Sequence, residues 1–108
     1  MTDIPQIFGQ ELPPANIQTN LVTVAFNDSA QINIFVANQS INFDYFSICV
    51  LPFDQSVQPA NYIAYNSPIV SGGVVSFAQI FLGSGDRVLV QTQNGTCSFT
   101  ATGILYTP

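Results

Sequence analysis

The stretch Ala30-Gln31-Ile32-Asn33-Ile34-Phe35-Val36-Ala37 decides the fold class of this chain. Ile32, Ile34 and Val36 share one face of an extended segment, and the residues between them share the other. A period of two is typical of a half-buried β-strand, because successive side chains point to opposite faces of a sheet. We therefore predict a strand here with one apolar face against a core.

Similar short segments lie on both sides of this stretch and are separated by Gly, Pro, Asn, Asp and Ser. Further strands are expected over residues 21–26, 45–51, 61–65, 74–82, 87–93 and 96–106. Asn94-Gly95 favours a type I′ turn, which predicts a hairpin between the last two of these segments. Because no window keeps a 3.6-residue apolar period, we expect no helix longer than a turn or two.

About seven or eight short strands in 108 residues predict a single all-β domain. We expect an antiparallel β-sandwich or a jelly-roll-like domain over residues 21–108. Residues 1–20 contain Pro5, Pro13 and Pro14 and lack strand alternation, which predicts an extended N-terminal arm. We expect this arm to pack less tightly than the rest and to reach a neighbouring subunit.

The charge of the chain is unusual. Charged residues make up 6% of it, where about 25% is usual, and the net charge is −5 with Arg87 as the one basic residue. Phosphate contacts need Lys and Arg, so a nucleic-acid partner is excluded. No apolar run reaches the roughly 20 residues of a membrane-spanning helix, and the first residues do not resemble a secretory signal. A surface covered by amides and hydroxyls suits a subunit that works in an assembly.

The residues needed for catalysis or metal binding are scarce, so we expect no enzyme, no cofactor and no metal site. The chain has no His, which removes the commonest catalytic base and zinc ligand. The six acids are scattered, four at expected turns and two in the arm: Asp28, Asp44, Asp54, Asp86, Asp3 and Glu11. Turn Asp residues usually accept hydrogen bonds from nearby backbone.

The two cysteines lie in expected strands with opposite facings. Cys97 falls on the core face of its segment, while Cys49 falls opposite the core-facing Phe46, Ile48 and Val50. A disulfide needs converging Cβ vectors, so we expect two free thiols.

Several apolar residues fall outside the expected core. The candidate interface residues are Ile7, Phe8, Phe35, Tyr45, Leu51 and Leu89. A contiguous exposed apolar patch marks an interface, whereas the alternative is a second packed surface within the same domain. We expect the four tyrosines to serve packing, with stacking on sugars as the alternative.

The order of several short motifs resembles small virion structural proteins of tailed bacteriophages, cyanophages among them. The motifs are Ile7-Phe8-Gly9-Gln10, Val36-Ala37-Asn38-Gln39-Ser40, Asn61-Tyr62-Ile63-Ala64-Tyr65, Leu82-Gly83-Ser84-Gly85-Asp86 and the segment 98–103. The chain departs from the family at Leu105-Tyr106, where an acid is common. It also departs over residues 21–25, where the family often has Leu-Tyr-Thr-Val-Pro.

The resemblance implies a non-enzymatic β-sandwich protein of the virion, and it carries no catalytic residues. We expect a capsid decoration or cement protein at the capsid surface, with the major capsid protein as its partner and a homo-oligomeric state. The alternatives are a neck, tail or fibre component, and a carbohydrate-binding module for host surface glycan.

Overall fold

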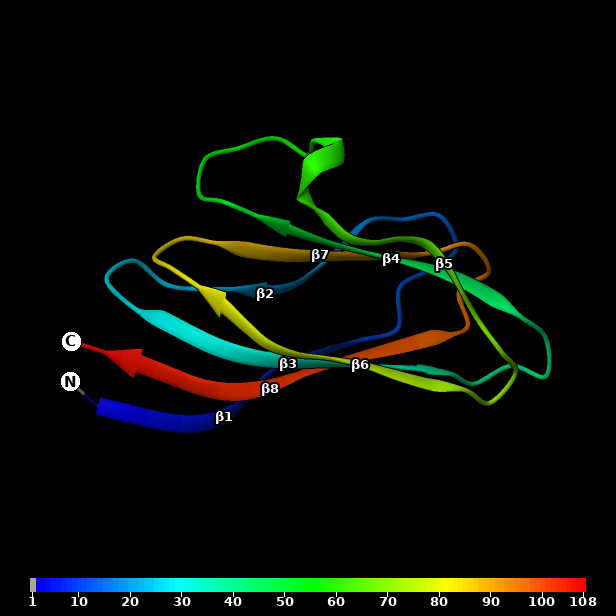
Figure 1. Ribbon diagram of the computed structural model, residues 1–108, viewed down its shortest axis with the longest axis horizontal. Coiled ribbons are helices and arrows are strands. Elements are labelled where there is room, and N and C mark those ends of the chain that lie inside the picture. Colours follow the sequence, from blue (N-terminus) through cyan, green and yellow to red (C-terminus); the bar gives the residue numbers. More distant parts are fainter. Residues whose placement is uncertain (1) are drawn as a thin grey trace.

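The computed structural model describes residues 2–108 and confirms an all-β fold. The strands are β1 (Thr2–Glu11), β2 (Thr19–Thr23), β3 (Ser29–Asn38), β4 (Asp44–Leu51), β5 (Tyr62–Ile69), β6 (Val74–Leu82), β7 (Arg87–Thr92) and β8 (Cys97–Thr107), with one helical turn, η1 (Pro59–Asn61). They form two antiparallel four-stranded sheets, ordered β1-β8-β3-β6 and β2-β7-β4-β5, which pack face to face (Figure 1).

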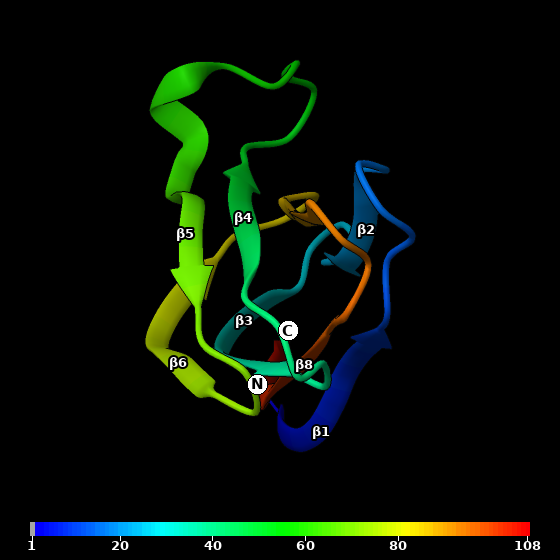
Figure 2. The same cartoon turned by 90° about the vertical axis from the view of Figure 1, so that its right-hand side faces the viewer.

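The pairing of the strands is nested. β1 pairs with β8, β2 with β7, β3 with β6 and β4 with β5. The chain is thus one long hairpin that folds over into two layers, which is the jelly-roll arrangement. Seen from its end, the two layers and the connection between β4 and β5, which rises above its sheet, are distinct (Figure 2).

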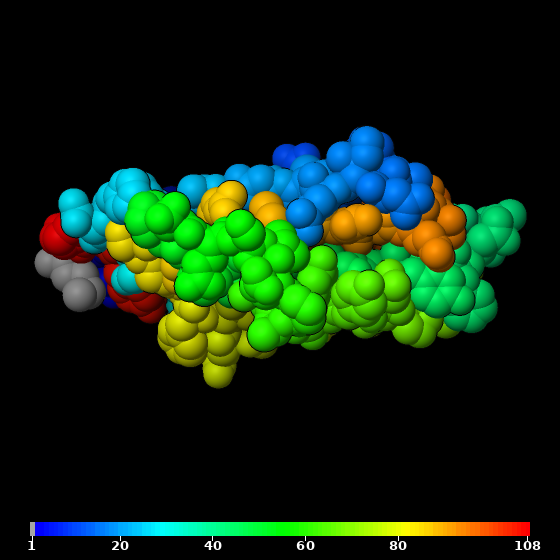
Figure 3. Space-filling view, turned by 90° about the horizontal axis from the view of Figure 1, so that it is seen from above, coloured from blue at the N-terminus to red at the C-terminus, as the bar shows by residue number. Residues whose placement is uncertain are grey.

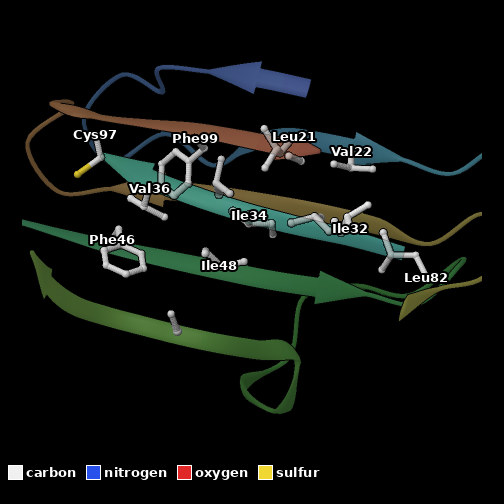
Figure 4. Close-up of a cluster of buried hydrophobic side chains, with 14 of the residues drawn as sticks. Leu21, Val22, Ile32, Ile34, Val36, Phe46, Ile48, Leu82, Cys97 and Phe99 are labelled. Atoms are coloured by element: carbon white, nitrogen blue, oxygen red, sulfur yellow. The ribbon is translucent and has the colours of Figure 1, made fainter. Parts of the chain in front are cut away.

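The core fills the space between the two sheets. Ile32, Ile34 and Val36 of β3 are fully buried, as their alternation predicts, and they lie opposite Phe46 and Ile48 of β4 (Figure 4). Each such side chain stabilises the fold by about 1.5–3 kcal/mol through its removal from water. The packed sheets therefore hold the side chains of their outer faces in fixed positions.

The hairpin predicted at Asn94-Gly95 is wrong. β7 and β8 belong to different sheets, so this turn crosses from one layer to the other. Gly95 has a positive φ of 75°, while Asn94 is not among the residues with positive φ, so the turn is not type I′. The amides of the turn bind side chains instead: Asn94 N donates to Asp44 and Gly95 N donates to the Thr92 hydroxyl, both at 2.9 Å.

The expected arm over residues 1–20 is in large part a strand of the sandwich, with Met1 outside the described residues. β1 pairs with β8 along its whole length, with a bulge around Phe8, which packs against the core. Because β1 is an edge strand with most of its residues exposed on both faces, its sequence shows no alternation. Pro5 is tolerated there, since an edge strand leaves one side of its backbone unpaired.

Candidate functional site

The six candidate interface residues do not form one patch. Ile7 and Phe35 lie on the outer face of the β1-β8-β3-β6 sheet and are 61% and 43% exposed. Tyr45 and the half-buried Leu89 lie on the outer face of the other sheet. Phe8 is partly buried against the core. The molecule therefore presents two outer faces of different character.

Leu51, a candidate interface residue, is buried with an exposed fraction of 1%, and Cys49 is equally buried. Both lie outside the main core cluster. The connection between β4 and β5 folds back over this end of the sheet (Figures 1 and 2). It is held there by Phe53 N, which donates to Asp86 at 3.1 Å, and by Arg87, which donates to the Gln55 carbonyl at 3.2 Å. A second small packed region within the domain thus takes up Leu51.

The outer face of the β1-β8-β3-β6 sheet, here named the uncharged face, is built from cross-strand neighbours. Partners in register share a face of a sheet. The register therefore places together Pro5, Ile7, Ile104, Thr100, Thr102, Gln31, Asn33, Phe35, Ser76, Val74 and Phe81. Val74 and Phe81 are 66% and 71% exposed. Among the described residues, one charged side chain lies on this face. It is Asp3, which pairs with Tyr106 at one corner of the sheet.

Val74 and Phe81 also belong to this face, although no pattern in the sequence indicated them. Both lie on β6, which is an edge strand and pairs with β3 at Phe81↔Gln31 and Val74↔Ala37. Gln31 and Ala37 point outward by the same alternation that puts Phe35 outward, so their partners on β6 also point outward. That pairing joins strands far apart in the sequence, so no local pattern reveals it.

The other outer face carries a hollow lined by tyrosines, here named the tyrosine groove. One part has a volume of about 270 Å³ and is lined by Tyr45, Tyr62, Tyr65, Asn16, Ser47, Asn66, Gln91, Thr92 and Gln93. The adjoining part, of about 630 Å³, shares Tyr62 and Tyr65 and adds Val57, Gln58 and Pro59. The two shared rings lie edge to face, with their centroids 5.0 Å apart.

One irregularity in β5 brings Tyr62 and Tyr65 to the same face. Side chains three residues apart in a regular strand point to opposite faces. Here β5 has one extra residue relative to β4 around Ile63, between the two tyrosines. A second extra residue lies at Tyr65-Asn66, where Asn66 has a left-handed φ of 45°. Bulges of this kind re-aim side chains. The spacing of the two tyrosines implies opposite faces in a regular strand, so the groove could not be predicted from the sequence.

Asp44 is a buried carboxylate with a structural role. Its Oδ1 accepts from Tyr45 N and Asn94 N, and its Oδ2 accepts from Thr96 N and the Thr96 hydroxyl, over 2.7–3.1 Å. Burial alone would raise the pKa of Asp44, but these hydrogen bonds outweigh it and hold the pKa below its ordinary value. Asp86 likewise accepts from Gly83 N. Asp86 confirms the prediction that a turn Asp binds nearby backbone, whereas Asp44 lies at the start of β4 and binds mainly the distant turn after β7.

The two thiols are free and buried. Cys97 faces the core, and its pKa is raised to about 12 by burial, by the charge of nearby Asp44 and by a hydrogen bond to that carboxylate. Burial also raises the pKa of Cys49, against a smaller opposing effect of Arg87. Thiolates are the reactive form of cysteine, so neither thiol is poised to act as a nucleophile.

Over residues 2–108, no group of three or more His, Cys, Asp or Glu lies together in a way that could hold a metal ion. Within the same residues, no helix has the length and apolar character needed to cross a membrane. The candidate sites are therefore the uncharged face and the tyrosine groove. Comparison with protein-family models finds no match, and neither does comparison with curated proteins.

Proposed function

We propose that this chain is a non-enzymatic structural protein of a tailed-phage particle, a decoration or cement protein that assembles as a homo-oligomer on the head. The order of its sequence motifs resembles virion structural proteins, and the jelly roll is a fold that capsid proteins use. The observation that carries the proposal is the uncharged face. Copies of the chain meet through this face.

Charge supports a second copy as the occupant of this face. Every copy carries a net charge of −5, so a contact between copies that buried acids would strand like charges. The uncharged face avoids most of this cost, because apart from Asp3 at one corner its polar groups are amides and hydroxyls that can pair across an interface. Its exposed apolar side chains Ile7, Phe35, Val74 and Phe81 supply the area to be removed from water.

The size of the face supports the same occupant. Four strands about 4.8 Å apart and roughly 33 Å long present an area on the order of 600 Å². A stable protein–protein interface buries about 800 Å² on each partner. The face therefore supplies about three quarters of that area, and the margins of the contact supply the remainder.

Substitution on the face tests the assembly. Phe81→Asp places a charge on an edge strand where the native side chain is 71% exposed, so the isolated fold is little affected. We expect its solution mass, measured by sedimentation, to fall to that of a monomer. Ile63→Asp is the matched control, since Ile63 is 44% exposed on edge strand β5 of the other sheet, and it should keep the native mass. Equal masses for Phe81→Asp and the native chain would contradict an assembly through this face.

Immuno-electron microscopy of intact phage particles tests the place in the virion. An antibody against this chain should decorate the head. Decoration confined to the neck, tail or fibres would support the alternative location within the particle. Particles without any label, in a preparation where the chain is not detected by mass spectrometry, would contradict a virion role.

A further inference from the structure

The proposed assembly leaves the tyrosine groove unused. The groove lies on the outer side of the β2-β7-β4-β5 sheet, and the uncharged face lies on the outer side of the other sheet. Figure 3 looks onto the groove's side of the molecule, where β7 lies between the segment that leads into β2 and the β4–β5 connection with β5. A subunit that associates through one sheet keeps the opposite one open.

The aromatic side of the groove offers ring faces to a ligand. Tyr65 is 66% exposed and Tyr45 is 39% exposed. Removing a large aromatic ring from water lowers the free energy, so these rings favour a ligand that covers them. Tyr62 packs edge-on against Tyr65, so the pair forms an angled wall. Beside it, Val57 and Pro59 extend the apolar surface.

The polar side of the groove offers hydrogen-bond donors and acceptors that the fold does not use. Among residues 2–108, the structure shows no intrachain hydrogen bond from the side-chain amides of Gln91, Gln93 or Asn66. By contrast, the buried Asn38 amide makes bonds to three carbonyls, at Asn42, Ile69 and Val70. The groove amides are therefore available to a ligand.

The backbone that carries these groups is held in place. Ser47 Oγ accepts from Asn66 N at 3.0 Å, and Gln93 N donates to the Tyr45 carbonyl at 2.9 Å. Both bonds tie neighbouring strands or the turn after β7 to β4. A site on rigid strands loses little conformational entropy when a ligand binds.

No charged side chain lines either part of the groove within the described chain. A phosphate, sulfate or carboxylate ligand would lack a cation to pair with, and the net charge of −5 would repel it. The chemistry fits a neutral ligand with one apolar side and many hydroxyls. An uncharged sugar ring has both, since its C–H groups gather on a ring face and its hydroxyls lie around the rim.

We propose that the tyrosine groove binds an uncharged oligosaccharide. One ring packs on Tyr65 and Tyr62, and its hydroxyls exchange hydrogen bonds with Gln91, Gln93 and Asn66. The two adjoining hollows share the tyrosine pair, so the ligand extends over more than one sugar ring. This inference is separate from the assembly of the chain, because it uses the opposite sheet.

Calorimetric titration of the whole protein tests the proposal. The probes are neutral hexasaccharides of glucose, mannose, galactose and N-acetylglucosamine, with oligogalacturonate as the acidic comparison. At least one neutral probe should bind, and Tyr65→Ala should weaken its affinity by about tenfold or more, because a ring face is lost. Gln91→Ala gives a second variant that keeps all aromatic packing and should also weaken binding.

Tyr106→Ala is the matched control, since Tyr106 lies on the sheet with the uncharged face and should leave the affinity unchanged. A thermal melt of each variant confirms that it is folded. The proposal is overturned if no neutral probe binds, if the acidic probe binds best, or if folded Tyr65→Ala and Gln91→Ala both keep the native affinity. The proposed assembly is tested by solution mass and the proposed groove by sugar affinity, so either proposal can fail without the other.

Discussion

Thr96 donates two hydrogen bonds to a single oxygen of Asp44, from its hydroxyl at 2.7 Å and from its backbone N–H at 3.1 Å. Asp44 begins β4 and Thr96 precedes β8, so this pair links the two sheets at one end of the sandwich. The Asn38 amide lies beside it, with its oxygen 2.9 Å from the same hydroxyl. The turns at this end are thus organised around buried polar side chains.

Asp44→Asn should destabilise the fold. The substituted amide presents a donor where the carboxylate accepted from backbone N–H groups, and it leaves buried donors without a partner. We expect the free energy of unfolding in a denaturant titration to fall by about 2–4 kcal/mol. Asp54→Asn is the control, since Asp54 is exposed at a left-handed φ of 61° that Asn also adopts. A loss no larger for Asp44→Asn than for Asp54→Asn would contradict this role.

The same carboxylate gives stability a pH dependence. Because hydrogen bonds outweigh burial, the pKa of folded Asp44 lies below its ordinary value of 3.8. The unfolded chain therefore takes up this proton first as the pH falls. The stabilisation is present above pH 3.8 and is lost as the pH falls through the folded pKa. Melting temperatures of the native chain should fall more steeply below about pH 4 than those of Asp44→Asn; parallel curves would contradict the assignment.

Gly95→Val should weaken folding even though the turn is not the predicted hairpin. Gly95 has a φ of 75°, and a Cβ there would lie 3.0 Å from Ala15 N. A β-branched side chain at this φ should lower the free energy of unfolding by on the order of 1 kcal/mol or more. Gly95→Asn is the comparison, because Asn tolerates a left-handed backbone and should lose less. An unchanged melting midpoint for Gly95→Val would show that the turn adopts another conformation.

Cys49 and Cys97 should resist thiol reagents in the native protein. Both are buried, and the pKa of Cys97 is raised to about 12 by burial and by Asp44, so the thiolate fraction at pH 8 is very small. We expect no reaction with a disulfide reagent under native conditions and reaction of both thiols in denaturant. Rapid labelling of either thiol in the folded protein would contradict the packing around it.

Alternation along the chain was enough to predict the sandwich and part of its core. The facing of Ile32, Ile34 and Val36 needed only the period of two, because β3 has one face on the core. β1 escaped prediction because an edge strand exposed on both faces needs no alternation. The prediction of a hairpin was wrong because it used only the local turn preference of Asn94-Gly95. In the structure this turn binds Asp44, fifty positions earlier.

The candidate surfaces were predictable only in part. Phe35 was found by its facing in an alternating segment, and Ile7 was a candidate only as an apolar residue of the expected arm. Leu51 is covered by a connection whose path no strand pattern describes. Tyr62 and Tyr65 come together through a bulge around Ile63 in β5, and a bulge reverses the facing that sequence spacing implies. Pairing between distant strands and irregular backbone were the two features beyond the reach of local patterns.

Solution mass at low protein concentration, measured with and without high salt, tests most directly the claim that the uncharged face joins copies of this chain. We expect a multiple of the 11.7 kDa chain mass. High salt should leave it unchanged, because an interface of apolar groups, amides and hydroxyls depends little on ion pairs. A mass of 11.7 kDa under both conditions would contradict the assembly proposed for the uncharged face.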